Sequence, residues 1–135
     1  MIVVDTNVLV HATFAGSQRG AADAALLRDG AWAAPRLWRN EMRSVLRQQM
    51  RVAGLSLPQA VEIFSDASRI IGQREHDVET AHVLDLASGS GCTAYDCEFA
   101  SVALKLGTRL VTEDRQLLRA FPELAVPLEV FAAGG

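Results

Sequence analysis

Four acidic residues of this chain lie in stretches that otherwise have the composition of a protein core: Asp5, Glu41, Asp96 and Asp114. Buried carboxylates that share a site repel one another, and they are costly unless protons or cations compensate their charge. No lysine or arginine motif is placed to neutralise these four. A divalent cation is the simplest compensation. Because the ligands would be hard oxygens, with no histidine or cysteine at suitable spacing, Mg²⁺ or Mn²⁺ is favoured over zinc.

Two of the four acids follow segments that have the pattern of buried strands. Residues 2–4 form a continuous apolar, β-branched run that ends at Asp5, which predicts a strand buried on both faces of a parallel sheet. Residues 109–112 predict another strand, and Asp114 comes two residues later. In open α/β sheets, ligands bind beyond the carboxyl ends of the strands, where the strand order reverses. Asp5 and Asp114 are therefore expected to meet in one crevice.

The other two acids are expected to point inward from helices. At about 100° per residue, Asp96 lies in the middle of the apolar face of a helix predicted over residues 95–106. Glu41 lies at the edge of the apolar stripe of a helix predicted over residues 36–52. Glu98, about 200° from Asp96 around the helix axis, is expected to face solvent and to matter little for activity.

Each acid also has a simpler structural explanation. Asp5, Asp96 and Asp114 could each cap the helix that follows. Glu41 could form an exposed ion pair with an arginine one turn away. One shared site explains all four positions at once, and this is the favoured hypothesis.

The arginines of the helix predicted over residues 36–52 lie on the face opposite Glu41 and are expected to be solvated, although a partner surface is an alternative. They are Arg36, Arg39, Arg43, Arg47 and Arg51.

Strands alternate with helices along the whole chain, which predicts an α/β fold with a mainly parallel central sheet and helices on both faces. A single domain over residues 1–135 is expected, because the chain is long enough for one core and too short for two. The SGSGC sequence at residues 88–92 is expected to be a loop. The remaining pattern predicts helices over residues 6–14, 19–28, 58–72 and 79–87, a short helix from Asp114, and strands at residues 31–34, 75–78 and 128–131.

Composition excludes several classes of protein. The net charge of −3 rules out the global basic field of non-specific nucleic-acid binders, so any contact with nucleic acid must be local. Cys92 and Cys97 have no partner pair at zinc spacing, which fits reduced cytosolic thiols. No apolar run has the length of a membrane span, and a cytoplasmic protein is expected. His11, His76 and His82 show no partner pattern and are expected to be surface or core residues.

The motifs VVDTNVLV, LWRNEMRSVL and AYDCEFASVALKLGTRLVTEDRQLL, in this order, resemble the PIN domain, in particular the VapC-type toxins of bacterial toxin–antitoxin pairs. The resemblance spans nearly the whole chain. It implies a Mg²⁺-dependent endoribonuclease with a Rossmann-like α/β/α sandwich, usually dimeric and held inactive by a cognate antitoxin. Leu117 stands where some relatives have a further acid, which counts against a second metal ion. The site residues that the resemblance implies are Asp5, Glu41, Asp96 and Asp114, with Asn7 and Thr112 in supporting roles.

The expected reaction is hydrolysis of phosphodiester bonds in single-stranded or looped RNA, with the cation held by Asp5 and Asp96, while Glu41 and Asp114 position water or a second ion. One alternative is a PIN-domain nuclease that acts in RNA processing or on DNA, outside toxin–antitoxin systems. Another is a non-catalytic interaction module with a vestigial acid cluster. An aspartyl phosphatase is disfavoured, because Asn7 occupies the position of the second aspartate that such an enzyme requires.

Overall fold

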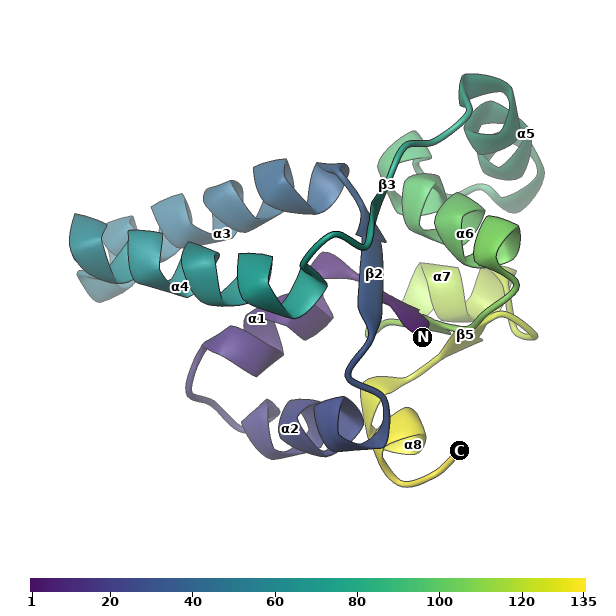
Figure 1. Cartoon of the computed structure of the whole chain (residues 1–135). Helices are drawn as coiled ribbons and strands as arrows, with labels where there is room; N and C mark the ends of the chain where they lie inside the picture. The colour runs from purple at the N-terminus through teal and green to yellow at the C-terminus, as the bar shows by residue number, and fades with distance from the viewer.

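A sheet of five parallel strands, in the order β3-β2-β1-β4-β5, runs through the centre of the molecule (Figure 1). The computed structural model describes all of residues 1–135. From the central strand β1 the chain builds outward to β2 and β3, and it then crosses to the other side of β1 for β4 and β5. The strands are β1 (Ile2–Val4), β2 (Trp32–Pro35), β3 (Glu75–His76), β4 (Leu110–Val111) and β5 (Ala125–Val126).

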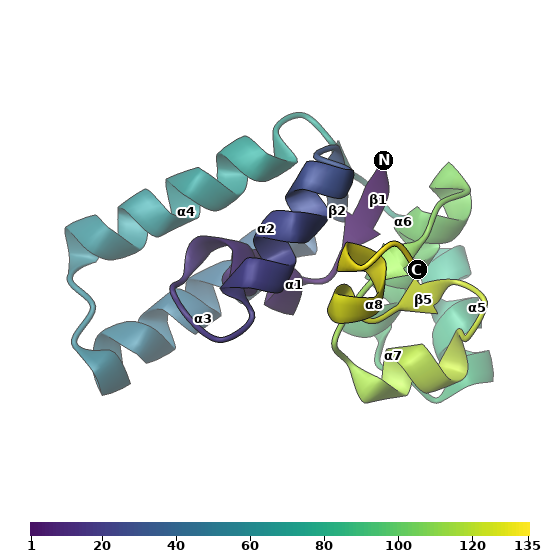
Figure 2. The same ribbon diagram turned by 90° about the horizontal axis from the view of Figure 1, so that it is seen from below.

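Helices cover both faces of the sheet, with α1 to α4 on one side and α5 to α7 on the other (Figure 1, Figure 2). The eighth helix packs against α2. This arrangement confirms the expected α/β fold class. No helix is both long enough and apolar enough to span a membrane. The helices are α1 (Thr6–Thr13), α2 (Arg19–Arg28), α3 (Leu37–Ala53), α4 (Leu57–Ile71), α5 (Thr80–Ser90), α6 (Ala94–Leu106), α7 (Arg115–Ala120) and α8 (Leu128–Ala132).

Strand β1 lies at the centre of the core and fixes where the chain can place its acids. Val3 and Val4 are fully buried, because α6 packs on β1, β2 and β4 on one face and helices cover the other. The register pairs Val3 with Leu110 and Val4 with Val111 of β4. The residues that follow β1 and β4 therefore emerge next to each other at the same edge of the sheet, where the strand order reverses.

Two of the predicted elements are wrong. Residues 128–131, predicted as a strand, are helical in α8, and the last strand is instead β5. The buried side chains of this segment are Leu128 and Phe131, three residues apart, which is the spacing of one helix face, whereas Val130 is exposed. The predicted loop at residues 88–92 begins later than expected, because α5 continues to Ser90. The helix ends there because Gly91, its C-cap, has a left-handed φ of 75°.

The arginines of α3 are mostly solvated, as expected, with only Arg39 half-buried, but the first two also form ion pairs. The side chain of Glu75 on β3 is only 9% exposed, and it accepts hydrogen bonds from Arg39 Nε at 2.6 Å and Arg36 Nη1 at 3.1 Å. The indole Nε1 of Trp38 donates to the same carboxylate at 2.9 Å. Arg43 lies over the ring of Phe64 on α4. The first turn of α3, which precedes Glu41, is thus anchored to the edge strand of the sheet.

Candidate active site

A cleft of about 370 Å³ lies beyond the carboxyl ends of β1 and β4, and it contains all four acids that the sequence singled out. They come from four different places: the ends of two strands, α3 and the first turn of α6. The sequence separations are large, so only the sheet order and the packing of the two helices bring these side chains together. The lining consists of Asp5, Thr6, Asn7, Val10, His11, Glu41, Val45, Asp96 and Asp114.

Asp5 is the most deeply placed acid, with 7% of its surface exposed. Its Oδ1 accepts a hydrogen bond from the backbone N–H of Thr6 at 2.8 Å, so it caps α1 as well as lining the cleft. Its Oδ2 accepts from the hydroxyl of Thr112 at 2.8 Å. Burial raises the pKa of Asp5 to about 6, although both hydrogen bonds oppose the rise, and the negative charges of Glu41 and Asp96 add to it.

Glu41 is held by a hydroxyl group and not by an arginine. The Oγ1 of Thr6 donates to Glu41 Oε1 at 2.6 Å, which ties the first residue of α1 to α3. The alternative of an exposed ion pair is therefore wrong for this residue. Burial raises the pKa of Glu41, and the neighbouring charges of Asp96 and Glu98 raise it further.

Asp114 combines a capping role with a place in the cleft. Its Oδ1 accepts from the backbone N–H of Leu117 at 2.9 Å, which makes it the N-cap of α7. Its own backbone N–H donates to the Oγ1 of Thr112 at 3.0 Å. The fully buried Thr112 hydroxyl thus donates to the Asp5 carboxylate and accepts from the backbone N–H of Asp114. This one group links the residues that follow β1 and β4.

Asp96 does not cap its helix, because Thr93 is the N-cap of α6 and its Oγ1 accepts from the backbone N–H of Asp96 at 3.1 Å. The carboxylate of Asp96 is half-buried and opens into the cleft. Burial raises its pKa, and the charge of Asp114 adds to the rise. The capping explanation is wrong for this residue, and its carboxylate is free to bind a ligand.

The donor set of the cleft fits a hard divalent cation. Besides the carboxylates, the side-chain oxygen of Asn7 is buried at the cleft and has no hydrogen-bond partner in the protein. Carboxylate and amide oxygens are the ligands that Mg²⁺ prefers. As the side chains stand, no three acidic, histidine or cysteine residues approach closely enough to hold a metal ion together. The residues are therefore suited to Mg²⁺ by the chemistry of the oxygens that line one cleft, with Asn7 as an unsatisfied oxygen among them.

The surroundings of three residues near the acids differ from what the sequence pattern indicates. Glu98 is half-buried and not fully exposed; burial raises its pKa, and it is close enough to Glu41 to raise the pKa of that residue too. The charge of Glu98 reaches Glu41 on α3, and the sequence pattern of α6 alone does not reveal this neighbour. His11 lines the cleft, and its spacing of four from Asn7 places both on one face of α1. Thr6 carries no local sequence signal for its contact with Glu41, because the two residues are 35 positions apart.

The PIN domain family model matches residues 2–123, and the chain therefore belongs to the PIN domain family. Among curated proteins, the chain is similar to Ribonuclease VapC3 of Pyrobaculum aerophilum, with 31% identity over 91 residues. That match covers 67% of this chain and 65% of the relative, so the chain spans less than two thirds of the relative's length. The resemblance to VapC-type PIN proteins is confirmed by these two comparisons.

The fold is also similar to a solved structure, PAE2754 from Pyrobaculum aerophilum. The TM-score is 0.78 at 22% sequence identity, and the alignment covers 98% of this chain and 93% of the other. The similarity therefore extends over nearly the whole fold. At this identity the likeness supports the fold alone.

Replacement of Thr112 by valine is expected to lower the free energy of unfolding by about 1–3 kcal/mol, since it leaves a buried carboxylate and a backbone N–H without their shared partner. Thr112→Ser keeps the hydroxyl and loses only a methyl group, so it serves as the control. Urea unfolding of both variants measures the difference. A Thr112→Val protein as stable as Thr112→Ser would show that the hydroxyl is not what holds these residues.

Protonation of Asp5 is expected to stabilise the metal-free protein. Its pKa of about 6 in the folded chain, against about 3.9 in an unfolded one, corresponds to about 3 kcal/mol. Because the folded-state pKa is raised, this contribution is fully present below about pH 4 and is lost as the pH rises through about 6. The difference in unfolding free energy between wild type and Asp5→Asn, measured from pH 4 to 8, isolates the effect. A difference that stays constant over this range would contradict the burial argument.

Proposed function

We propose that this protein is a Mg²⁺-dependent endoribonuclease and the toxin component of a VapBC-type toxin–antitoxin pair. The observation that carries the proposal is the convergence of Asp5, Glu41, Asp96 and Asp114 on one cleft at the point where the strand order reverses. No basic side chain forms an ion pair with any of the four. Uncompensated carboxylates in a PIN-family protein, with raised pKa values at three of them, favour a cation-dependent reaction over a purely structural cluster.

In the proposed reaction, a water molecule attacks the phosphorus of an RNA phosphodiester, the bond to the leaving oxygen breaks, and that oxygen receives a proton. A bound Mg²⁺ would supply charge compensation for the phosphate and a lowered pKa for the attacking water. Asp5, Asp96 and the amide oxygen of Asn7 are the residues that would hold it. Glu41, oriented by the Thr6 hydroxyl, orients the water and accepts its proton, because its raised pKa is closer to neutrality.

RNA is the proposed substrate and a cognate antitoxin the proposed inhibitor. The name of the relative Ribonuclease VapC3 supports both, as does membership of the PIN family. The proposal includes a homodimer, as the family resemblance implies. It also includes a cytoplasmic location, where RNA is found and where the free thiols of Cys92 and Cys97 stay reduced.

Cleavage of single-stranded RNA in the presence of Mg²⁺ tests the proposal. Asp96→Asn is expected to lower the rate by about a hundredfold or more, because it removes one charge from the set that compensates the phosphate without disturbing a cap. Asp85→Asn makes the same chemical change at an exposed position of α5 and is expected to cleave like wild type. Omission of divalent cations should abolish cleavage by wild type.

Equal rates for wild type and Asp96→Asn would remove Asp96 from the mechanism. Cleavage of DNA in preference to RNA under the same conditions would move the protein outside the proposed toxin class. Absence of cleavage of either substrate by the correctly folded protein would favour a non-catalytic interaction module.

A further inference from the structure

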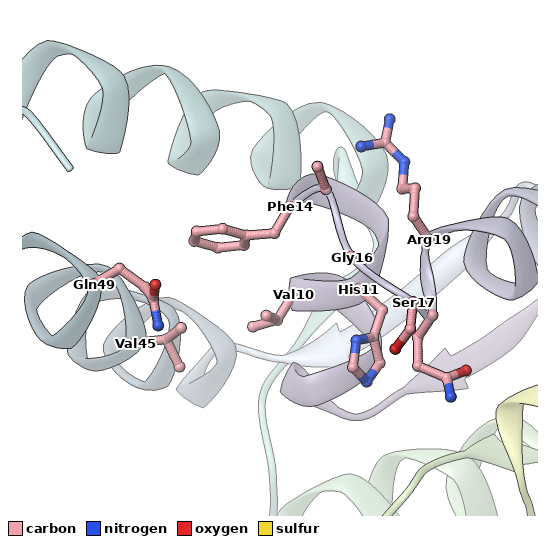
Figure 3. Close-up of a pocket in the computed structure, with 10 residues that line it drawn as sticks. Val10, His11, Phe14, Gly16, Ser17, Arg19, Val45 and Gln49 are labelled. Carbon is pink, nitrogen blue, oxygen red and sulfur yellow. The ribbon is translucent and has the colours of Figure 1, made fainter. Parts of the chain in front are cut away.

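A second cavity, of about 290 Å³, adjoins the acidic cleft. It shares Val10, His11 and Val45 with that cleft, so the two form one continuous depression along α1. Figure 3 shows Val10 and Phe14 pointing from α1 and its end toward Val45 and Gln49 of α3. The loop between α1 and α2 closes the far end, and the lining is Val10, His11, Phe14, Ala15, Gly16, Ser17, Gln18, Arg19, Val45 and Gln49.

The lining combines apolar walls with unused hydrogen-bonding groups. Phe14 contributes the flat face of an aromatic ring to the cavity wall, and Val45 contributes a branched apolar side chain. His11, Ser17 and Gln49 offer both donors and acceptors, and none of these three side chains forms a hydrogen bond within the protein, although their neighbours Thr13, Gln18 and Arg19 do. Only four of the ten lining residues are hydrophobic, and apolar surface beside free polar groups suits a flat heterocycle with polar edges.

The size and position of the cavity restrict what it can hold. Its volume lies at the lower limit of the roughly 300–1,000 Å³ of ligand pockets, which is enough room for a single base. His11 lies six residues after Asp5, about 9 Å along the axis of α1 at about 1.5 Å per residue. A base bound there therefore belongs to a nucleotide beside the phosphate in the acidic cleft, and not to the cation site itself.

We propose that this cavity is a base-recognition subsite, which binds the base of a nucleotide flanking the scissile phosphate of single-stranded RNA. The inference rests on the proposed ribonuclease function. Unstacked bases are bound by apolar and aromatic side chains and are distinguished by hydrogen bonds to their edges, which a duplex does not expose. Gln49, with one donor group and one acceptor in a single amide, is the residue that discriminates between bases, and Phe14 contacts the ring.

Cleavage of an RNA library, with random bases around the cut and sequencing of the ends, tests the subsite. Wild type is expected to favour particular bases at one fixed position next to the cut. Gln49→Leu, close to the native side chain in size, should lower that preference about fivefold, the effect of one lost hydrogen bond. Gln48→Leu is the matched control, since Gln48 is exposed on the same helix and outside the cavity, and it should keep the wild-type preference.

Ser17→Ala provides a second variant in an exposed loop, where a folding defect is not expected, and it should also reduce the preference. Unchanged preference in both Gln49→Leu and Ser17→Ala would overturn the inference, and so would a wild type without preference next to the cut. If the two variants instead weaken binding of a partner protein and leave base preference intact, the cavity holds a protein segment, and the inference is wrong.

A separate binding measurement distinguishes failure of the subsite from failure of the proposed function. The four nucleoside 5′-monophosphates are titrated into the wild-type protein, and the side-chain amide of Gln49 is followed by NMR. A base-dependent shift of this signal supports the subsite even if wild type cleaves no RNA, an outcome that would contradict the proposed function alone. No shift with any of the four, together with no cleavage, would overturn both.

Discussion

The site depends on one electrostatic constraint: several carboxylates share a cleft in which no basic side chain balances them. Asp5 and Asp114 are brought there by the order of the parallel strands, and Glu41 and Asp96 by helices packed beside that edge. Burial and mutual repulsion raise the pKa of Asp5 to about 6, and those of Glu41 and Asp96 also rise. Arg36 and Arg39, at the start of α3, pair with Glu75 on β3 and not with any of these acids.

Hydroxyl groups, which carry no charge, hold the acids in place. The Thr6 hydroxyl orients Glu41, and the Thr112 hydroxyl links Asp5 to the start of α7. A neutral donor fixes a carboxylate geometrically without cancelling its charge, so the negative charge of the cleft is retained. An arginine paired with these carboxylates would instead neutralise them and supply the compensation that a metal ion is expected to provide.

The sequence predicts the features that follow from short-range pattern. The apolar run before Asp5 and the position of Asp96 on its helix are sufficient to place both near one crevice, and Asp5 and Asp114 cap helices while also lining the cleft. Contacts between residues that are far apart in the sequence cannot be predicted from such local patterns. The charge of Glu98 reaches Glu41 on α3, and Thr6 meets Glu41 only through the packing of α1 on α3.

Calorimetric titration with Mn²⁺ near pH 6.5 measures most directly whether the acidic cleft binds a divalent cation. The account predicts saturable binding to wild type, accompanied by proton release, because the cation displaces the proton that Asp5 partly retains near its pKa of about 6. Binding should be strongly weakened in Asp96→Asn. Absence of binding to wild type, or equal affinity in Asp96→Asn, would contradict the account.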